Sequence, residues 1–428
     1  MRVLIDGQTL ETPDIDRGIG IYFRNTLKSM LEQDFSIEWF ITVSKHDSLN
    51  KLDDWVAEKL MPLCSNDFCP ININNEGYEC QTRYTHTLEK AVIENSIDLI
   101  WSPNVLMTNV MFPVKKPACK MMVTIHDLIP LIFNDYYFNQ WPDEAVSEYK
   151  KRLSNISSWC EGVIFDSAST KNDYISQYVC KHWQVIHLGV SRKFSPKIST
   201  SKINDPFILY TGGFDYRKNM NRALEAFARS IDLIKNQELK QSIKYVVVCS
   251  LPPDAKEEYF GLAGKLQVKD RLIMTGFVSH SELQMLYKEC TTFFFPSLYE
   301  GLGLPVLEAM ASGAPVVISN NSSLPEVGGQ SAYYCDPLNI EDMAQKLALS
   351  LEDSERSERI LEGTKHAKSF TWEKTGLETL SFIRDVHLKG SHFQKEIKKK
   401  DKKNIAYLSP LLPQRSGIAK FSSQLLPH

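Results

Sequence analysis

Short apolar runs alternate with helical patterns along almost the whole chain. Within the runs, β-branched and aromatic residues follow one another with little polar interruption, which is typical of parallel strands buried on both faces. We therefore predict an α/β fold built from two doubly wound sheets. The runs expected to form strands are Val3–Asp6, Trp39–Ser44, Leu99–Ser102, Met121–His126, Gly162–Asp166, Val185–Leu188, Phe207–Tyr210, Tyr245–Cys249, Leu272–Thr275, Thr292–Phe295, Pro315–Ser319 and Ala332–Cys335.

Polar residues 191–206 divide this pattern into two domains, because the stretch combines Ser, Lys and Pro with little periodicity. We expect the first domain to cover 1–190 and the second to cover 207–390. In the second domain, Asn219 is a candidate N-cap of a helix. The apolar stripe expected on that helix consists of Leu224, Phe227, Ile231 and Ile234.

A basic stretch and a further strand-like run follow the two domains. Residues 395–403 contain six lysines and two acids. We interpret 391–404 as a solvated basic linker, with contact to anionic lipids as the alternative. Residues 405–428 then contain a strand-like run and the letters RSGIAKF, which resemble RGIGIYF at 17–23. The similarity predicts an internal repeat that begins in this last segment, against the alternative of chance similarity.

Composition and charge exclude several classes of protein. Apolar residues make up 43% and charged residues 24% of the 428 residues, which is ordinary for a globular protein and excludes disorder of the whole chain. The 49 basic and 52 acidic side chains nearly balance, so there is no electrostatic reason to expect nucleic acid as a partner. The sequence contains no run of 18 apolar residues, so it predicts no membrane-spanning helix. Nine scattered cysteines, and a first strand in place of a secretion signal, favour the cytoplasm.

The segment 296–315, PSLYEGLGLPVLEAMASGAP, is the most informative part of the chain. It follows the expected strand Thr292–Phe295, and Pro305 fits the first position of a helix. Glu300 is expected in the loop before this helix and Glu308 in its first turn. Two carboxylates and free N–H groups would then meet beyond the carboxyl end of a parallel strand, where open α/β sheets bind ligands. The alternative is an ordinary helix start with N-terminal acids.

Basic residues follow a second strand end. Gly212 and Gly213 lie at the end of the strand Phe207–Tyr210, and Arg217 and Lys218 precede the next helix. Two adjacent cations at a helix N-terminus suit a diphosphate, because they add charge-assisted hydrogen bonds to the backbone N–H groups. A solvated Arg-Lys pair is the alternative.

Two further strand ends carry candidates. Arg17-Gly18-Ile19-Gly20 follows the first strand, and glycine there lets the backbone approach a ligand closely. His126 ends the strand Met121–His126. A lone histidine at a strand end is most often structural, but its neighbours along the sheet edge make it a candidate.

We expect no metal site. Asp14-Ile15-Asp16 has the D-x-D form used by some metal-dependent sugar transferases of a different fold, but it only precedes the glycine loop of the first strand. Cys64, Cys69 and Cys80 are clustered without partners at zinc spacing.

Taken in order, these motifs resemble those of the GT-B glycosyltransferases, specifically glycosyltransferase family 4, over most of residues 1–385. The most specific element is the E-x7-E pattern from Glu300 to Glu308. The supporting elements are RGIG at 17–20, IHDL at 125–128, RKN at 217–219, TGFVSHSEL at 275–283 and LPEVGG at 324–329.

The resemblance implies two Rossmann-like domains that face each other across a cleft, the first binding the acceptor and the second the nucleotide-sugar donor. It implies that Glu300 binds donor-sugar hydroxyls, that Lys218 with Arg217 holds the diphosphate, and that His126 lies near the reacting sugar. Many relatives have Arg where this chain has Gly213, so we assume that Arg217 supplies that charge. Donor-binding positions implied by the motifs are Gly18, Gly20, Gly212, Gly213, Phe277 beside the base, Gly301, Leu302, Gly303, Leu304 and, on the ribose, Glu308.

The implied activity is a retaining, metal-independent transfer of a hexose to a glycan or lipid-linked acceptor, with no cofactor besides the donor substrate. The RKN and LPEV variants look most like bacterial mannosyltransferases that build polysaccharides such as O antigen from GDP-mannose. The cysteine usage favours the cytoplasm, and the basic stretch makes the inner face of the membrane a possible place, with polysaccharide-assembly proteins as possible partners. The internal repeat makes 405–428 the start of a possible second transferase module. The alternatives are a sugar-nucleotide epimerase, a phosphorylase and an inactive glycan-binding scaffold.

Overall fold

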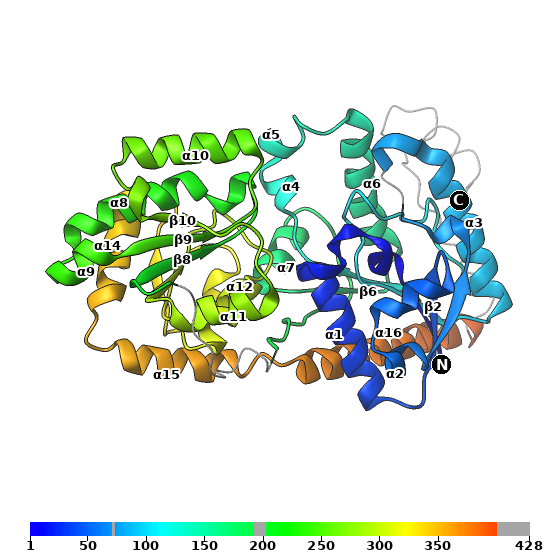
Figure 1. Cartoon of the computed structure of the whole chain (residues 1–428). Helices are drawn as coiled ribbons and strands as arrows, with labels where there is room; N and C mark the ends of the chain where they lie inside the picture. The colour runs from blue at the N-terminus through cyan, green and yellow to red at the C-terminus, as the bar shows by residue number, and fades with distance from the viewer. Residues whose placement is uncertain (71–72, 192–202, 400–428) are drawn as a thin grey trace, which may run out of the picture. The chain divides into compact units, whose positions relative to one another are not determined.

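Two parallel sheets organise the part of the chain that the structure describes, which is residues 1–70, 73–191 and 203–399 of a computed structural model (Figure 1). Residues Met1–Val386 form one compact unit that contains both sheets. The first sheet has seven strands in the order β3-β2-β1-β4-β5-β6-β7, and the second has six in the order β10-β9-β8-β11-β12-β13. The order reverses beside β1 and beside β8, which gives each doubly wound sheet a switch point. The predicted fold class is confirmed.

The first sheet lies in the first half of the chain, among seven α-helices of the described residues. Its strands are β1 (Arg2–Asp6), β2 (Glu38–Val43), β3 (Leu60–Cys64), β4 (Leu99–Ser102), β5 (Lys120–Ile125), β6 (Gly162–Phe165) and β7 (Trp183–Val185). Its helices are α1 (Gly18–Gln33), α2 (Asp54–Ala57), α3 (Ile73–Glu94), α4 (Ile129–Ile132), α5 (Asn134–Tyr137), α6 (Asp143–Trp159) and α7 (Ala168–Ile175), with 3-10 turns η1 (Gln8–Glu11), η2 (Pro13–Asp16), η3 (His46–Lys51) and η4 (Asn66–Phe68).

The second sheet follows from residue 207. Its strands are β8 (Phe207–Thr211), β9 (Lys244–Val248), β10 (Leu272–Met274), β11 (Thr292–Phe295), β12 (Val316–Ser319) and β13 (Tyr333–Cys335). The helices are α8 (Met220–Leu233), α9 (Gln237–Ser242), α10 (Pro253–Lys265), α11 (His280–Glu289), α12 (Leu304–Ala311), α13 (Leu324–Gly328), α14 (Ile340–Glu352), α15 (Arg356–Ala367) and α16 (Trp372–Lys399), with 3-10 turns η6 (Tyr216–Lys218) and η7 (Lys269–Arg271).

The strands form where continuous apolar runs can be covered on both faces. Every residue of β8, β11 and β12 is buried. The edge strand β3 was not predicted, because LMPLC contains a proline and only Leu60 in it is buried. β7 lies at Trp183–Val185 and not at the predicted Val185–Leu188, because its pairing with β6 ends at Val185. Ile186 beyond it is nevertheless fully buried.

Asn219 precedes α8 as predicted, but it does not cap the helix with its side chain. Its backbone is left-handed, with φ of 60°, and its amide group points elsewhere. On the apolar stripe of α8, Leu224 and Phe227 are fully buried, whereas Ile231 is only half-buried. These residues pack against one face of the second sheet, where α8 and α14 lie side by side (Figure 1).

Helix α16 returns to the first sheet after the second sheet is complete. A Cβ atom at Gly162 would lie 2.5 Å from Val386 Cγ2, and Lys120 Nζ donates to Val386 O at 3.1 Å. Arg384 also forms an ion pair with Asp34 at the end of α1. The part of α16 up to Val386 therefore packs on elements of the first half.

Several predicted segments fall wholly or partly outside the described residues. Residues 192–202 of the predicted linker 191–206 are among them, as is the predicted second module at 405–428. Of the predicted basic linker 391–404, the part up to Lys399 belongs to α16. Among the helices of the described residues, none combines the length and apolar character needed to cross a lipid bilayer.

Candidate active site

The loop between β11 and α12 contains Glu300 and is shaped by two glycines. Gly303 precedes α12 with φ of 105°, a conformation that a side chain would strain. A Cβ atom at Gly301 would lie 2.3 Å from the backbone oxygen of His126, so this loop lies directly against the end of β5. Pro305 lies in the first turn of α12, as predicted.

The Glu300 carboxylate binds both predicted cations. Its Oε1 lies 2.6 Å from Lys218 Nζ, and its Oε2 lies 2.6 Å from Arg217 Nη1. Glu300 is only 7% exposed. Burial raises the pKa of its carboxyl, but Lys218 and Arg217 outweigh this and bring that pKa to about 2. Glu300 is therefore ionised at neutral pH and held between two charge-assisted hydrogen bonds.

The turn η6, which carries the two cations, is fixed at its backbone oxygens. Leu298 N donates to Arg217 O at 2.7 Å, and Tyr210 Oη donates to Lys218 O at 2.8 Å. Asn219 Nδ2 donates to the backbone oxygens of Pro296 and Pro337, at 3.0 and 2.7 Å. The side chain of Asn219 thus ties η6 to the ends of β11 and β13. Its place before a helix predicted only capping, so this role was not predicted.

Glu308 lies deeper than predicted. The prediction of a place in the first turn is wrong, because α12 begins at Leu304 and Glu308 falls in its second turn. Burial raises the pKa of Glu308 to about 8, and the hydroxyl of Tyr287 lies 3.4 Å from Oε2. At neutral pH this carboxyl is mostly protonated, in contrast to Glu300.

His126 links three neighbouring strand ends of the first sheet. Its Nδ1 lies 2.5 Å from Asp166 Oδ2, after β6, and its Nε2 lies 2.8 Å from Pro103 O, after β4. Both ring nitrogens face acceptors, so the doubly protonated imidazolium satisfies the site. Burial lowers the pKa of His126, but Asp166 outweighs it and the pKa lies above its ordinary value. Asp166 was not predicted, although it too follows a buried strand.

The loops that carry Glu300, Arg217 and Lys218 lie in a segment that matches a known protein family. Residues 191–367, which include Glu300, Arg217 and Lys218, match the family model described as Glycosyl transferases group 1. This segment is a group 1 glycosyl transferase domain.

Relatives of the chain include bacterial mannosyltransferases. The chain is 31% identical over 279 residues to the serotype-specific mannosyltransferase WbdA of Escherichia coli, which covers 62% of this chain and 33% of that protein. It is 32% identical over 177 residues to the O-antigen chain mannosyltransferase B of E. coli, which covers 41% of this chain and 45% of the relative. The chain thus spans about a third to a half of the length of these curated relatives.

Solved structures extend the similarity beyond the group 1 domain. WaaG, a glycosyltransferase involved in lipopolysaccharide biosynthesis, has a TM-score of 0.63 at 14% identity, covering 90% of this chain and 99% of that one. The sucrose-phosphate synthase of Thermosynechococcus elongatus has a TM-score of 0.60 at 17% identity and covers 93% of this chain. These similarities show the GT-B fold, with the group 1 domain as its second half.

Hydrogen bonds join the group 1 domain to the first half beside Glu300. The hydroxyl of Thr170 donates to His126 O at 3.2 Å and lies 3.3 Å from Gly301 O. Glu326, in the LPEVGG motif, accepts from Ala168 N at 2.8 Å and Ser169 N at 2.9 Å. A carboxylate of the group 1 domain therefore occupies the N-terminus of α7.

The remaining predicted donor-binding residues lie on loops and helix starts outside these contacts. A Cβ atom at Gly20, in the first turn of α1, would lie 2.0 Å from Ile15 O in η2, so this glycine is needed where α1 packs against η2. A Cβ atom at Gly18 would meet open space. The other positions lie in segments that follow strands of the second sheet. A Cβ atom at Gly212 would contact the Tyr210 side chain, whereas one at Gly213 would meet open space. Phe277 is 92% exposed, Leu302 is buried, and Leu304 is the first residue of α12.

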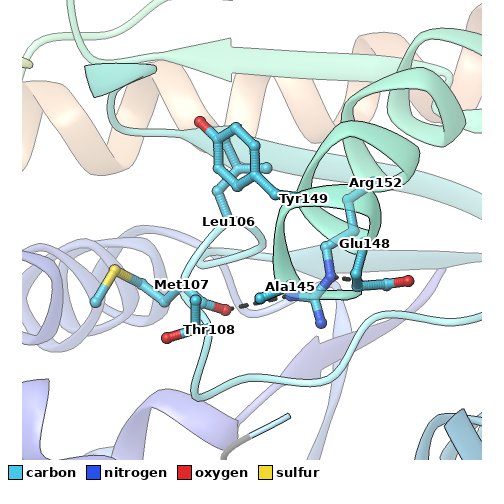
Figure 2. Close-up of a pocket in the computed structure, with 7 residues that line it drawn as sticks. All are labelled: Leu106, Met107, Thr108, Ala145, Glu148, Tyr149 and Arg152. Atoms are coloured by element: carbon cyan, nitrogen blue, oxygen red, sulfur yellow. Dashed lines mark hydrogen bonds and ion pairs between the residues drawn. The ribbon is translucent and has the colours of Figure 1, made fainter. Parts of the chain in front are cut away.

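Neither the D-x-D segment nor a pocket in the first half adds to this site. Asp14 accepts from Asn109 Nδ2 at 2.8 Å and lies 3.2 Å from Arg17 Nη1. No group of three or more His, Cys, Asp or Glu side chains suited to a metal ion occurs in the described part of the chain. Figure 2 shows a pocket whose lining contains none of the predicted site residues: Leu106, Met107, Thr108, Ala145, Glu148, Tyr149 and Arg152.

Proposed function

We propose that this protein transfers a hexose from a nucleotide sugar to a growing cell-surface polysaccharide or lipid-linked glycan, with retention of configuration. Mannose and GDP-mannose are the favoured sugar and donor, because WbdA and the O-antigen chain mannosyltransferase B are named as mannosyltransferases. The observation that carries the proposal is the Glu300 carboxylate held between Arg217 and Lys218 at the carboxyl edge of the second sheet.

The proposed chemistry uses the two cations on the leaving group. Breaking the bond between sugar C1 and the phosphate oxygen leaves positive charge on the sugar and negative charge on the diphosphate. Arg217 and Lys218 stabilise that negative charge from fixed positions, without a metal or cofactor. The acceptor oxygen forms the new bond to C1, and its proton passes to the departing phosphate oxygen. Glu300 binds hydroxyls of the donor sugar and Glu308 those of the ribose.

His126 has a different part in this proposal. Both of its ring N–H groups are engaged by Asp166 and Pro103. It therefore does not act as a general base or nucleophile, and it fixes the strand ends that face the reacting sugar.

A donor screen tests the proposal. The protein is incubated with GDP-mannose, UDP-glucose, ADP-glucose or dTDP-glucose, with and without a mannan oligosaccharide, and release of nucleoside diphosphate is measured. We expect GDP release that requires the acceptor, and an axial anomeric linkage by NMR. An epimerase would convert the sugar without acceptor, a phosphorylase would require free phosphate, and a scaffold would bind the glycan without release; any of these would contradict the proposal.

We also propose that the enzyme works on the cytoplasmic side of the membrane with other polysaccharide-assembly proteins, and that a second transferase module begins in 405–428. The support for the second module is the similarity of RSGIAKF to RGIGIYF. Deleting 405–428 should then leave transfer and thermal stability unchanged. Loss of either on this deletion would contradict the module.

A further inference from the structure

A side chain of the first half reaches the turn that carries the two cations. The hydroxyl of Tyr137, in α5, donates to Asp215 Oδ1 at 2.6 Å, although the two residues are 78 positions apart. Asp215 is the N-cap residue directly before η6. The contact therefore joins the half expected to bind the acceptor to the donor-side turn of Arg217 and Lys218.

Asp215 is placed to set the position of Arg217 in two ways. Its Oδ1 accepts from Arg217 N at 3.1 Å, which fixes the backbone at the start of η6. The same oxygen lies 3.6 Å from Arg217 Nε, close enough to compete for the guanidinium. At the far end of that guanidinium, Nη1 donates to Glu300 Oε2 at 2.6 Å and to Tyr299 O at 3.3 Å. Because the Tyr137 hydroxyl donates to Asp215 Oδ1, this oxygen competes less for the guanidinium of Arg217, which faces Glu300.

Aromatic contacts hold the same segments together. The Phe133 ring makes edge-on contacts with Tyr216 and Tyr299, with centroid distances of 5.9 and 6.1 Å. Tyr136 stacks on Tyr216 at 4.6 Å. These contacts bring α5 against η6, and within this set Tyr137 supplies the polar, directional bond.

We propose that Tyr137 is a positioning residue for the diphosphate-binding cations, acting through Asp215. The inference rests on the proposed function for its ligand, a nucleoside diphosphate. It means that the orientation of Arg217 depends on a residue from the other half of the molecule, so the donor site is complete only with α5 in place.

The neighbouring tyrosine provides a matched control. Tyr136 lies in the same helix, and within the described residues its hydroxyl makes no hydrogen bond. Tyr136→Phe therefore removes a hydroxyl oxygen and leaves the hydrogen bond between Tyr137 and Asp215 in place. Binding of GDP by calorimetry, and kcat and KM with GDP-mannose, are measured for both variants beside their melting temperatures. We expect Tyr137→Phe to weaken GDP binding and to lower kcat, each on the order of tenfold, with an unchanged melting temperature. Tyr136→Phe should match the wild type.

A double-mutant cycle and a crystal structure make the inference decidable. In an Asp215→Ala background, Tyr137→Phe should have little further effect on GDP binding, because its partner is gone. In crystals of Tyr137→Phe, the Arg217 guanidinium should turn from Glu300 toward Asp215. Full additivity in the cycle, or an unmoved Arg217, would overturn the inference. A wild-type chain that binds no nucleoside diphosphate, beside a moved Arg217 in the variant, would refute the proposed function and still support the role of Tyr137.

Discussion

The Glu300 carboxylate forms ion pairs with both Arg217 and Lys218, so a donor diphosphate must compete with Glu300 for these two cations. Replacing Glu300 by Gln removes the competing charge and keeps the shape. We expect Glu300→Gln to cut transfer about ten- to a hundredfold, because a charge-assisted hydrogen bond to the donor sugar is lost. Its GDP affinity should stay level or rise. Turnover and calorimetric titration give the two values.

Lys218→Ala is the contrasting variant for this prediction, since it removes a cation and should weaken both transfer and GDP binding. Thermal unfolding serves as the control for folding, because breaking a buried ion pair is destabilising. If Glu300→Gln weakened GDP as strongly as Lys218→Ala does, the idea of competition would be wrong.

Glu308 makes stability depend on pH. Its pKa in the folded chain, about 8, lies above the ordinary value of 4.5 because of burial. The folded chain therefore holds a proton that the unfolded chain releases, and this site makes stability fall as pH rises from 4.5 to 8. The slope is at most about 1.4 kcal/mol per pH unit. Urea unfolding of the wild type and of Glu308→Gln at pH 5, 6.5 and 8 should diverge in that direction; parallel curves would refute it.

The residues that the sequence could identify are those marked by chain-local signals. Glu300, Arg217 and Lys218 lie in the segments that connect buried strands to the next helices, so strand ends and glycine or proline positions locate them. Tyr137 carries no such mark, and Asp166 follows the buried strand β6 but shows nothing of its pairing with His126. Their partners, Asp215 and His126, are 78 and 40 positions away, and only the assembled sheets bring these pairs together.

At the scale of elements, the tight contact between the Glu300 loop and the end of β5 predicts the effect of one methyl group. A Cβ atom at Gly301 would meet the backbone oxygen of His126, which cannot turn aside as a side chain can. We expect Gly301→Ala to lower the free energy of unfolding by roughly 1–3 kcal/mol and to reduce transfer. Chemical unfolding and turnover are the measurements.

Gly261→Ala in α10 is the matched control for Gly301→Ala. A Cβ atom at Gly261 would meet open space, and alanine is the better helix former, so this variant should be more stable by roughly 0.5–1 kcal/mol. Equal changes in the free energy of unfolding for Gly301→Ala and Gly261→Ala would show that the Glu300 loop can move to accommodate a methyl group, contrary to this prediction.

Elements were predictable where burial and sequence pattern agree. The fully buried strands β8, β11 and β12 appear as continuous apolar runs, so both sheets could be expected before their order was known. β3 was missed because an edge strand needs no continuous apolar run and tolerates a proline. The predicted turn of Glu308 was wrong because α12 begins at Leu304, one position before the expected Pro305, and this start depends on the conformation of Gly303, which the sequence does not specify.

For the molecule as a whole, the proposed mechanism needs no divalent ion, because Arg217 and Lys218 take the place of the metal on the diphosphate. We expect transfer from GDP-mannose to continue in saturating EDTA at close to its original rate. Activity that vanished with EDTA and returned with manganese or magnesium would overturn this expectation.

The capping of α7 by Glu326 has a consequence for how the two halves separate. The Glu326 carboxylate accepts from two N–H groups of the helix and lies 3.1 Å from His187 Nε2. To part α7 from α13, water must solvate one anion and two backbone amides at the same moment. The part of that free energy that comes from Glu326 is electrostatic and diminishes as the salt concentration rises, whereas the hydrogen bond from Thr170 to Gly301 O involves no charged group.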